Sequence, residues 1–204
     1  ATLQNTYAFF VLYANIDQFD PKEHDIASVK LTLMDKWILS RLNQLVKQAD
    51  EDLTAYRIPE PANAITAFVD DLSNWYVRRG RERFWGKGMD ETKEAAFATL
   101  YTVLTTLAHV IAPFVPYLSE EIYQNLVRTV YPDAPESVHL SLYPTADLSR
   151  VDETLNAQME ALLDVVSLGR ACRNAAALKV RQPLQTLYIK GAKLDEAFVE
   201  LAAD

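Results

Sequence analysis

Apolar side chains recur at intervals of three and four residues along much of this chain, which is the period of an amphipathic α-helix. The segment 31–56 carries the pattern most clearly, in one stripe made of Met34, Ile38, Leu42, Leu45, Ala49, Leu53 and Tyr56. Thr32 is suited to cap the start of this helix, and Pro59 and Pro61 end it and begin the next. The first clear element is therefore a long helix with one side facing a core.

The same period predicts further helices along the rest of the chain. They run over about 61–85, 90–112, 117–130 and 149–178, with a short one near 195–202. The second of them has the widest apolar face, so we expect it to be the most buried helix. Ser149 and Asp152 have the spacing of a capping box at the start of the long C-terminal helix.

Two short segments in the last third of the chain differ from this helical pattern. Residues 137–144 have the composition of an extended stretch, and residues 184–190 have that of a strand. The fold class is therefore predicted to be mainly α, an up-and-down helical bundle with a small, incomplete α/β appendage.

The charge is acidic in total but unevenly distributed. The 204 residues carry 20 Lys and Arg against 28 Asp and Glu, a formal net charge of -8. Residues 74–88 nevertheless hold five basic side chains against Glu82 alone, and residues 170–190 hold five with no acid. Because charges are screened beyond roughly 8–10 Å, a phosphate near either basic island responds mainly to that island. An anionic partner and acidic partners within the same molecule both remain possible.

The first basic island belongs to the run DLSNWYVRRGRERFW, residues 71–85. A regular helix advances about 100° per residue, so Arg79 and Arg83 continue the apolar stripe for its last two turns. The opposite face carries Asn74, Arg78, Arg81 and Trp85. A guanidinium group donates paired hydrogen bonds to phosphate, and an indole ring stacks on an unpaired base, so this pattern favours an RNA partner.

A structural interpretation stands beside this functional one. Arg79 and Arg83 are placed to pair with carboxylates of neighbouring helices, while Trp75 borders the apolar stripe and is expected in the core. In this interpretation the domain supports its neighbours through arginine-mediated contacts. For the arginines as a group we favour an anionic or inter-domain partner.

Cysteine and histidine indicate neither a metal site nor catalysis. Cys172 is the single cysteine, which fits a reducing compartment, and we expect it to be a small buried side chain. His109 is expected in the core and His24 in an exposed loop. We find no glycine-rich phosphate loop, no apolar run of the roughly 18 residues that cross a membrane and no signal peptide. The opening residues look like a cut inside a longer polypeptide.

The arginine run resembles the signature of isoleucyl-tRNA synthetases, a family of aminoacyl-tRNA ligases. Its arginine block separates the isoleucyl type from its valyl and leucyl relatives. Further matching blocks follow in the family's order: NTYAFFVLYANID at 5–17, DKWILSRLN at 35–43, APFVPYLSEEIY at 112–123, SVHL at 137–140 and KVRQPL at 179–184. Gly80 and Glu82 depart from the family's pattern, which has more polar or basic residues there.

The resemblance implies three parts along the chain. Residues 1–30 form a connection from the catalytic body, residues 31–136 a helical anticodon-binding bundle, and residues 137–204 a C-terminal junction with a long helix and a short strand. It also implies a cytoplasmic parent enzyme that joins isoleucine to its tRNA with ATP and Mg²⁺. None of that chemistry is expected within these residues, and no cofactor is expected to bind to them.

The partners implied are tRNA(Ile) and the catalytic domain of the same polypeptide, with no membrane. The residues that we expect to contact tRNA are Arg78, Arg81, Arg79, Arg83, Asn74, Trp85, Lys87, Arg181 and Gln182. Helical phase makes Arg78 and Arg81 the better candidates among the arginines, because Arg79 and Arg83 are predicted to face inward.

Overall fold

The computed structural model describes residues 2–179, 182–191 and 194–198, and the regular structure in these ranges is helical. The chain forms two compact units, residues 1–151 and 152–204. The α-helices of the first unit are α1 (Thr2–Ile16), α2 (Leu33–Thr54), α3 (Pro59–Asp70), α4 (Arg81–Trp85), α5 (Glu91–Ile111) and α6 (Pro116–Tyr123). The second unit contains α7 (Glu153–Ala175). The mainly α class is therefore confirmed.

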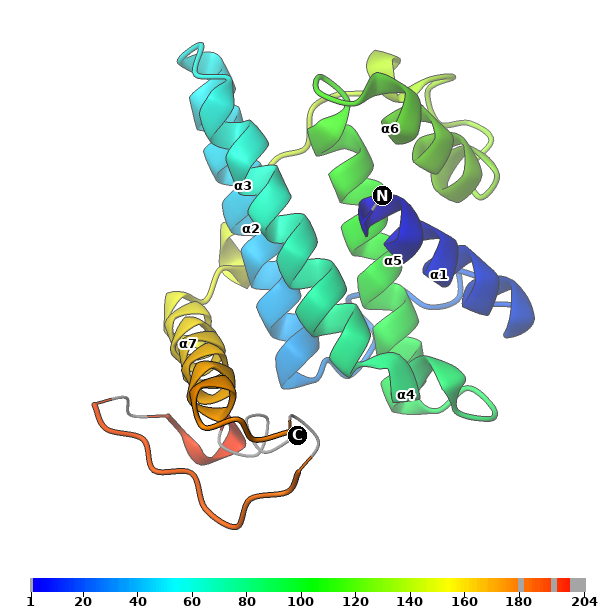
Figure 1. Ribbon diagram of the computed structural model, residues 1–204. Coiled ribbons are helices and arrows are strands. Elements are labelled where there is room, and N and C mark those ends of the chain that lie inside the picture. Colours follow the sequence, from blue (N-terminus) through cyan, green and yellow to red (C-terminus); the bar gives the residue numbers. More distant parts are fainter. Residues whose placement is uncertain (1, 180–181, 192–193, 199–204) are drawn as a thin grey trace. The chain divides into compact units, whose positions relative to one another are not determined.

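Helix α5 forms the centre of the first unit. Figure 1 shows it with the α2–α3 hairpin on one side and α6 on the other, and it also packs against α1 and α4. Its buried positions go round the helix and are mostly apolar: Ala95, Ala96, Phe97, Ala98, Leu100, Val103, Leu104, Leu107, Ala108, Val110 and Ile111. The small alanines let neighbouring helices approach closely, and the larger side chains fill the space between them. This burial agrees with the wide apolar face of the helix in the sequence.

By length and composition, α5 is also the one helix among the described residues that is apolar enough to cross a membrane. Inside the fold, 67% of its apolar window is buried. This is the pattern of a core helix in a folded domain.

The predicted start of α2 is confirmed in detail. The Thr32 side chain accepts a hydrogen bond from the Asp35 backbone N–H, and the Asp35 carboxylate accepts one from the Thr32 backbone N–H at 2.8 Å. These reciprocal bonds satisfy two backbone donors that a helix start leaves open. Helix α5 is capped by Asp90, whose carboxylate accepts from the Lys93 N–H at 2.8 Å.

Several predicted elements are wrong. The single helix expected over 61–85 is broken into α3, a π-helical turn called η1 (Asp71–Val77), and α4. Residues 137–144 contain a 3₁₀ turn, Val138–Leu140, and residues 184–190 lie outside any strand, so the expected α/β appendage has no strand in the described residues. Helix α1 has no counterpart among the predicted elements, because its sequence is apolar on most sides and lacks a clear period.

The C-terminal helix begins later than predicted. Ser149 lies in a 3₁₀ turn, Leu148–Arg150, and the N-cap of α7 is Asp152, whose carboxylate accepts from the Leu155 N–H at 2.9 Å. Asp152, which was expected inside the helix as the acid of a capping box, is thus the N-cap residue itself. Of the short helix expected over 195–202, residues 196–198 are helical and the end lies outside the described residues.

Two further expectations are corrected by the surroundings of the side chains. Cys172 is exposed instead of buried. His24 is mostly buried instead of exposed, since its ring stacks on Phe19 and its Nδ1 pairs with the carboxylate of Glu94. His109 is half-buried, and its Nδ1 lies 2.8 Å from the carbonyl oxygen of Thr105.

Candidate functional site

The arginine run leaves the α2–α3 hairpin through the π-helical turn η1. This turn is joined to α2 near both of its ends. Arg41 on α2 donates to Asp71 Oδ2 at 3.2 and 3.3 Å, and the Tyr76 hydroxyl donates to Asp35 Oδ1 at 2.6 Å. A π-helical turn contains an extra residue relative to an α-helical one, and such turns occur mostly at functional positions. The contacts with α2 therefore hold η1 in place, the turn at which the run deviates from regular α-helical geometry.

Gly80 separates η1 from α4. Its backbone N–H donates to the Tyr76 carbonyl at 3.0 Å, and a Cβ placed on Gly80 would lie only 2.8 Å from that oxygen. Because real Cβ atoms do not approach a backbone oxygen that closely, glycine permits the close approach of the two peptides. The departure from the family's pattern at this position is thus accommodated by the geometry of the turn.

Phe84 anchors α4 in the core. It is 1% exposed and packs edge-to-face against Phe97 of α5, with ring centroids 5.2 Å apart, and at the same centroid distance against Phe9 of α1. Aromatic pairs of this geometry add to the stabilisation that burial alone provides. With Phe84 turned inward, the next residue, Trp85, is turned outward.

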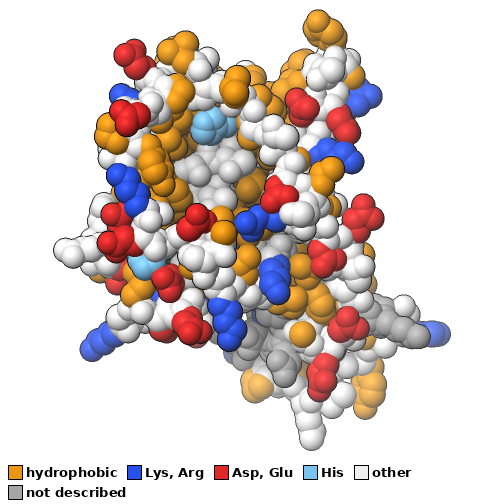
Figure 2. All heavy atoms as spheres, turned by 180° about the vertical axis from the view of Figure 1, so that it is seen from behind, with side chains coloured by type: hydrophobic (Ala, Val, Ile, Leu, Met, Phe, Trp, Pro, Cys, Tyr) orange, Lys and Arg blue, Asp and Glu red, His pale blue; other side chains and the backbone are white. Residues whose placement is uncertain are grey.

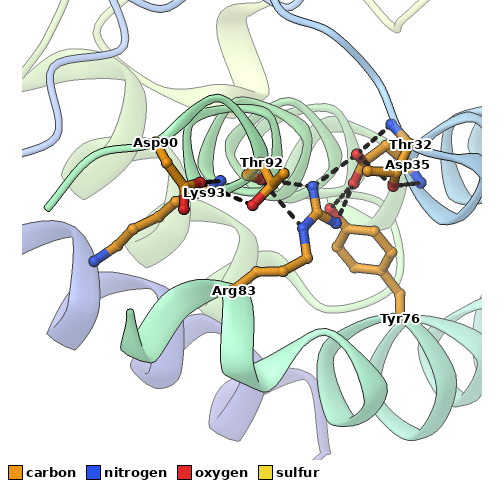
Figure 3. Close-up of polar contacts among 7 residues, drawn as sticks. All are labelled: Thr32, Asp35, Tyr76, Arg83, Asp90, Thr92 and Lys93. Carbon is orange, nitrogen blue, oxygen red and sulfur yellow. Dashed lines mark hydrogen bonds and ion pairs between the residues drawn. The ribbon is translucent and has the colours of Figure 1, made fainter. Parts of the chain in front are cut away.

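Arg83 forms the polar part of the same anchor, shown in Figure 3. Its two terminal nitrogens each donate to one oxygen of Asp35 at 2.8 Å, and Nε and Nη2 donate to the carbonyl of Thr92 at 3.1 and 2.7 Å. The Asp35 carboxylate is completely buried and also accepts from Tyr76 and from the Thr32 hydroxyl. Arg83 thus joins α4 to the start of α2 by a bidentate ion pair and to the start of α5 by hydrogen bonds.

The protonation states of this cluster follow from its contacts. Burial by itself raises the pKa of the Asp35 carboxyl, but the hydrogen bonds and charge of Arg83 outweigh it and hold that pKa below its usual range. Burial raises the pKa of the Tyr76 phenol well above its usual value, and the neighbouring Asp35 charge raises it further. The cluster is therefore an ionised Asp–Arg pair with a neutral tyrosine as donor.

Several polar and aromatic side chains of this region lie on the outside of the unit. Arg78 and Arg81 are exposed, as helical phase predicts, and Trp85 is 54% exposed. Asn74 and Lys87 are exposed as well. The structure thus separates the run into one arginine that holds the fold and two that face solvent.

Arg79 and Trp75 occupy an intermediate position. Both are half-buried, and the Arg79 guanidinium lies over the Trp75 ring at 5.7 Å from its centroid. The ring therefore covers a cation at the surface, where a place in the core was expected. A cation over an indole face is favoured by the electrostatics of the ring.

The second basic island lies in the second unit. Gln182 is exposed, and its carbonyl accepts from Arg173 Nη1 at 2.8 Å. Arg181, the other residue expected to contact tRNA there, lies outside the described residues. The two islands belong to different units of the chain.

Acidic groups accompany the basic ones on the surface. On the face shown in Figure 2, opposite to that of Figure 1, Asp and Glu side chains lie among the Lys and Arg side chains, so the basic groups there do not merge into one field. In the described part of the chain, no three His, Cys, Asp or Glu side chains come together as a bound metal ion requires.

Sequence reasoning missed Asp35 and Lys93 as parts of this site. Asp35 has the capping-box spacing from Thr32, but its pairing with Arg83, 48 residues away, had no local signal. A signal did exist for Lys93: it is the one basic side chain among the apolar positions early in α5, which is an unusual place for a lysine.

A helical unit with an anchored segment that presents arginine and tryptophan to solvent has the features of an RNA-binding domain. Comparison with known proteins supports that class. Residues 35–188 match the family model described as the anticodon-binding domain of tRNA ligase. The chain belongs to this family of anticodon-binding domains.

Relatives of the chain carry the name isoleucine–tRNA ligase. The chain is 51% identical to one from Clostridium novyi over 201 residues, which is 98% of this chain and 19% of that protein. Over the full length of this chain it is 45% identical to one from Clostridium tetani, of which the match covers 20%. Over 95% of this chain it is 47% identical to one from Dehalococcoides mccartyi, of which the match covers 19%. The chain thus spans about a fifth of the length of these curated relatives.

Proposed function

We propose that this chain docks tRNA(Ile) by its anticodon region within an isoleucine–tRNA ligase of the cytoplasm. Other parts of that ligase would bind ATP and Mg²⁺ and join isoleucine to the tRNA. The observation that carries the proposal is the family match, which extends from Asp35, the buried partner of Arg83, through the whole exposed part of the arginine run.

The exposed side chains of the run suit an RNA loop. Arg78 and Arg81 offer planar donors for phosphate oxygens, and Trp85 offers a ring face for an unstacked base. Asn74 within the run and Lys87 shortly after it add exposed hydrogen-bond donors. Because Arg83 is anchored in the fold, these side chains are presented by a fixed backbone, which reduces the entropy lost on binding.

The proposal predicts a salt-dependent loss of binding in the variant Arg78→Ala with Arg81→Ala. We expect its affinity for tRNA(Ile) to fall about fivefold to tenfold at low salt, and the slope of log K against log[salt] to decrease by about 1 to 2. Fluorescence anisotropy with labelled tRNA over a range of salt concentrations measures both quantities.

The matched control is Lys36→Ala with Lys47→Ala, which removes two exposed positive charges from α2, outside the run. If this control reduces affinity and salt slope as much as the arginine variant does, binding depends on total charge and the run is not the docking site. If neither variant binds less tightly than the unaltered chain, the proposal is wrong for these arginines.

The alternative interpretation, in which the arginines mediate contacts with another domain, does not fit Arg83. A role for Arg83 as a bridge to another domain conflicts with its contacts, because both of its partners, Asp35 and Thr92, lie in the same unit as Arg83 itself. Its guanidinium is 19% exposed, which leaves little surface for an additional phosphate. We therefore assign Arg83 to supporting the run and Arg78 and Arg81 to contacting the RNA.

A further inference from the structure

The most unusual buried group outside the Asp35–Arg83 cluster is the ammonium of Lys93. This side chain is 2% exposed and lies in the first turn of α5. Its Nζ donates to the Gly86 carbonyl at 2.7 Å and forms an ion pair with Asp17 Oδ2 at 2.6 Å. It also lies 5.9 Å from the centroid of the Phe97 ring. One lysine thus connects the segment after α1, the start of α5 and the end of α4.

Helix stability alone does not account for a lysine at this position. Burying an ammonium costs free energy that its partners must offset, and an apolar side chain of similar length would fill the same space without that cost. The charge instead provides a donor for Gly86, whose carbonyl follows directly after α4. A cation near the end of a helix also interacts favourably with the carbonyl groups exposed there.

The turn that receives this hydrogen bond is otherwise open to solvent. Every residue from Trp85 to Asp90 is exposed, and Gly88 has a positive φ of 77°. Besides the packing of Phe84 on Phe97, two side-chain hydrogen bonds hold this end of α4 on α5, from Arg83 to the Thr92 carbonyl and from Lys93 to the Gly86 carbonyl. Arg83 precedes the exposed Trp85 in the sequence, and Gly86, whose carbonyl Lys93 binds, directly follows it.

We propose that Lys93 is a positioning residue for RNA binding, which holds the turn after α4 so that Trp85 and Lys87 are presented to tRNA in one orientation. Asp17 supports this role, because its charge makes the burial of the ammonium tolerable. The inference rests on the proposed function and extends it to two residues that do not touch the RNA. In the absence of the lysine donor, the turn would sample several orientations and the two side chains would bind less well.

The experiment compares Lys93→Met with the double variant Lys93→Met, Asp17→Asn in the full-length ligase that contains this chain. The single variant leaves the Asp17 charge without its partner, so its stability falls. The double variant removes both charges and recovers stability, but it still lacks the donor to Gly86. Hydrogen exchange by mass spectrometry follows the amides of residues 85–90, with α2 as the internal reference, and aminoacylation gives KM for tRNA and kcat separately.

For the double variant we expect an unfolding midpoint close to that of the unaltered protein, faster amide exchange at 85–90 and unchanged exchange in α2. KM for tRNA should rise about fivefold with kcat changed less than twofold, because Trp85 and Lys87 act in binding and not in the chemical step. If KM returns to its original value together with stability, Lys93 is only a structural residue and the inference is overturned.

Two control variants distinguish a failure of positioning by Lys93 from a failure of the proposed function. They are Trp85→Ala and the pair Arg78→Ala, Arg81→Ala. If they raise KM for tRNA and the double variant at Lys93 does not, docking through the run stands and positioning by Lys93 is wrong. If they leave KM unchanged, docking through the run is wrong, and the role of Lys93 is overturned with it.

Discussion

Replacement of Arg83 by methionine will lower the free energy of unfolding of this domain by about 3 to 5 kcal/mol. Methionine fills most of the same volume but leaves the fully buried Asp35 carboxylate without its cation, and it leaves the Thr92 carbonyl without two donors. An unpaired buried charge is among the most costly defects that one substitution can introduce. Urea unfolding followed by circular dichroism at pH 7 measures the change.

Two comparison variants make this result specific. Lys47→Met breaks the exposed pair with Glu51, whose atoms are 4.0 Å apart, and should change stability little. Adding Asp35→Asn to Arg83→Met removes the stranded charge and keeps one of the two acceptor oxygens that Thr32 and Tyr76 use, so it should restore part of the loss. If the Arg83 variant loses no more stability than the Lys47 variant, the buried pair does not hold α4.

The pH dependence of the same variant has a definite sign. In the unaltered domain Arg83 holds the pKa of Asp35 below its usual value, so its contribution is complete above about pH 4 and is lost as the pH falls through the lowered pKa. Without Arg83, the burial that raises the pKa of Asp35 is opposed only by the hydrogen bonds from Tyr76 and Thr32, so the folded variant takes up a proton at a higher pH than the unaltered domain does. The difference in unfolding free energy between the two proteins should therefore shrink from pH 7 towards pH 4. A constant difference over this range would contradict the assignment.

Gly80→Ala will destabilise the domain by about 1 to 3 kcal/mol, although alanine has the higher helix propensity. The added Cβ would lie 2.8 Å from the Tyr76 carbonyl oxygen, so either the π-helical turn or α4 must shift. The matched control is Gly169→Ala in α7, where nothing beyond the adjacent residues and the backbone of the helix itself lies within 4 Å of the new Cβ. That change should stabilise by about 0.4 to 1 kcal/mol. Thermal or urea unfolding of both variants tests the opposite signs, and stabilisation by both would show that the close approach at Gly80 relaxes without cost.

The long helices of the first unit were predictable because their signals are local. The stripe of α2, its capping box at Thr32 and Asp35, and the wide apolar face of α5 are each contained within one segment. Helix α1 lacked such a signal, because its apolar residues occupy most sides and its partners lie in α5 and η1. The strand expected at 184–190 was wrong for a different reason. Composition shows that a segment favours extended backbone, but a strand also requires a second segment with which to form hydrogen bonds.

The candidate site was predictable in its chemistry more than in its geometry. Arg78, Arg81 and Trp85 are exposed as the spacing in a single helix predicts, although the structure divides that helix into α3, η1 and α4. The pairing of Arg83 with Asp35 spans 48 residues and depends on the packing of α2, α4 and α5 together. Such a contact leaves no local pattern, so the sequence indicated that Arg83 faces inward but not which carboxylate it meets.

The π-helical turn at Asp71–Val77 has a consequence for how this region can change in length. Because the π-helical turn holds one residue more than an α-helical turn, removal of one residue from it would restore a regular α-helix and leave the later side chains in their present directions. Replacement of the turn by a regular α-helix at unchanged length would instead rotate every later side chain by about 100°, the angle of one residue. The contacts of Arg83 with Asp35 and of Phe84 with Phe9 and Phe97 depend on these directions. A deletion within the turn is therefore easier to accommodate than a substitution that only makes the turn α-helical.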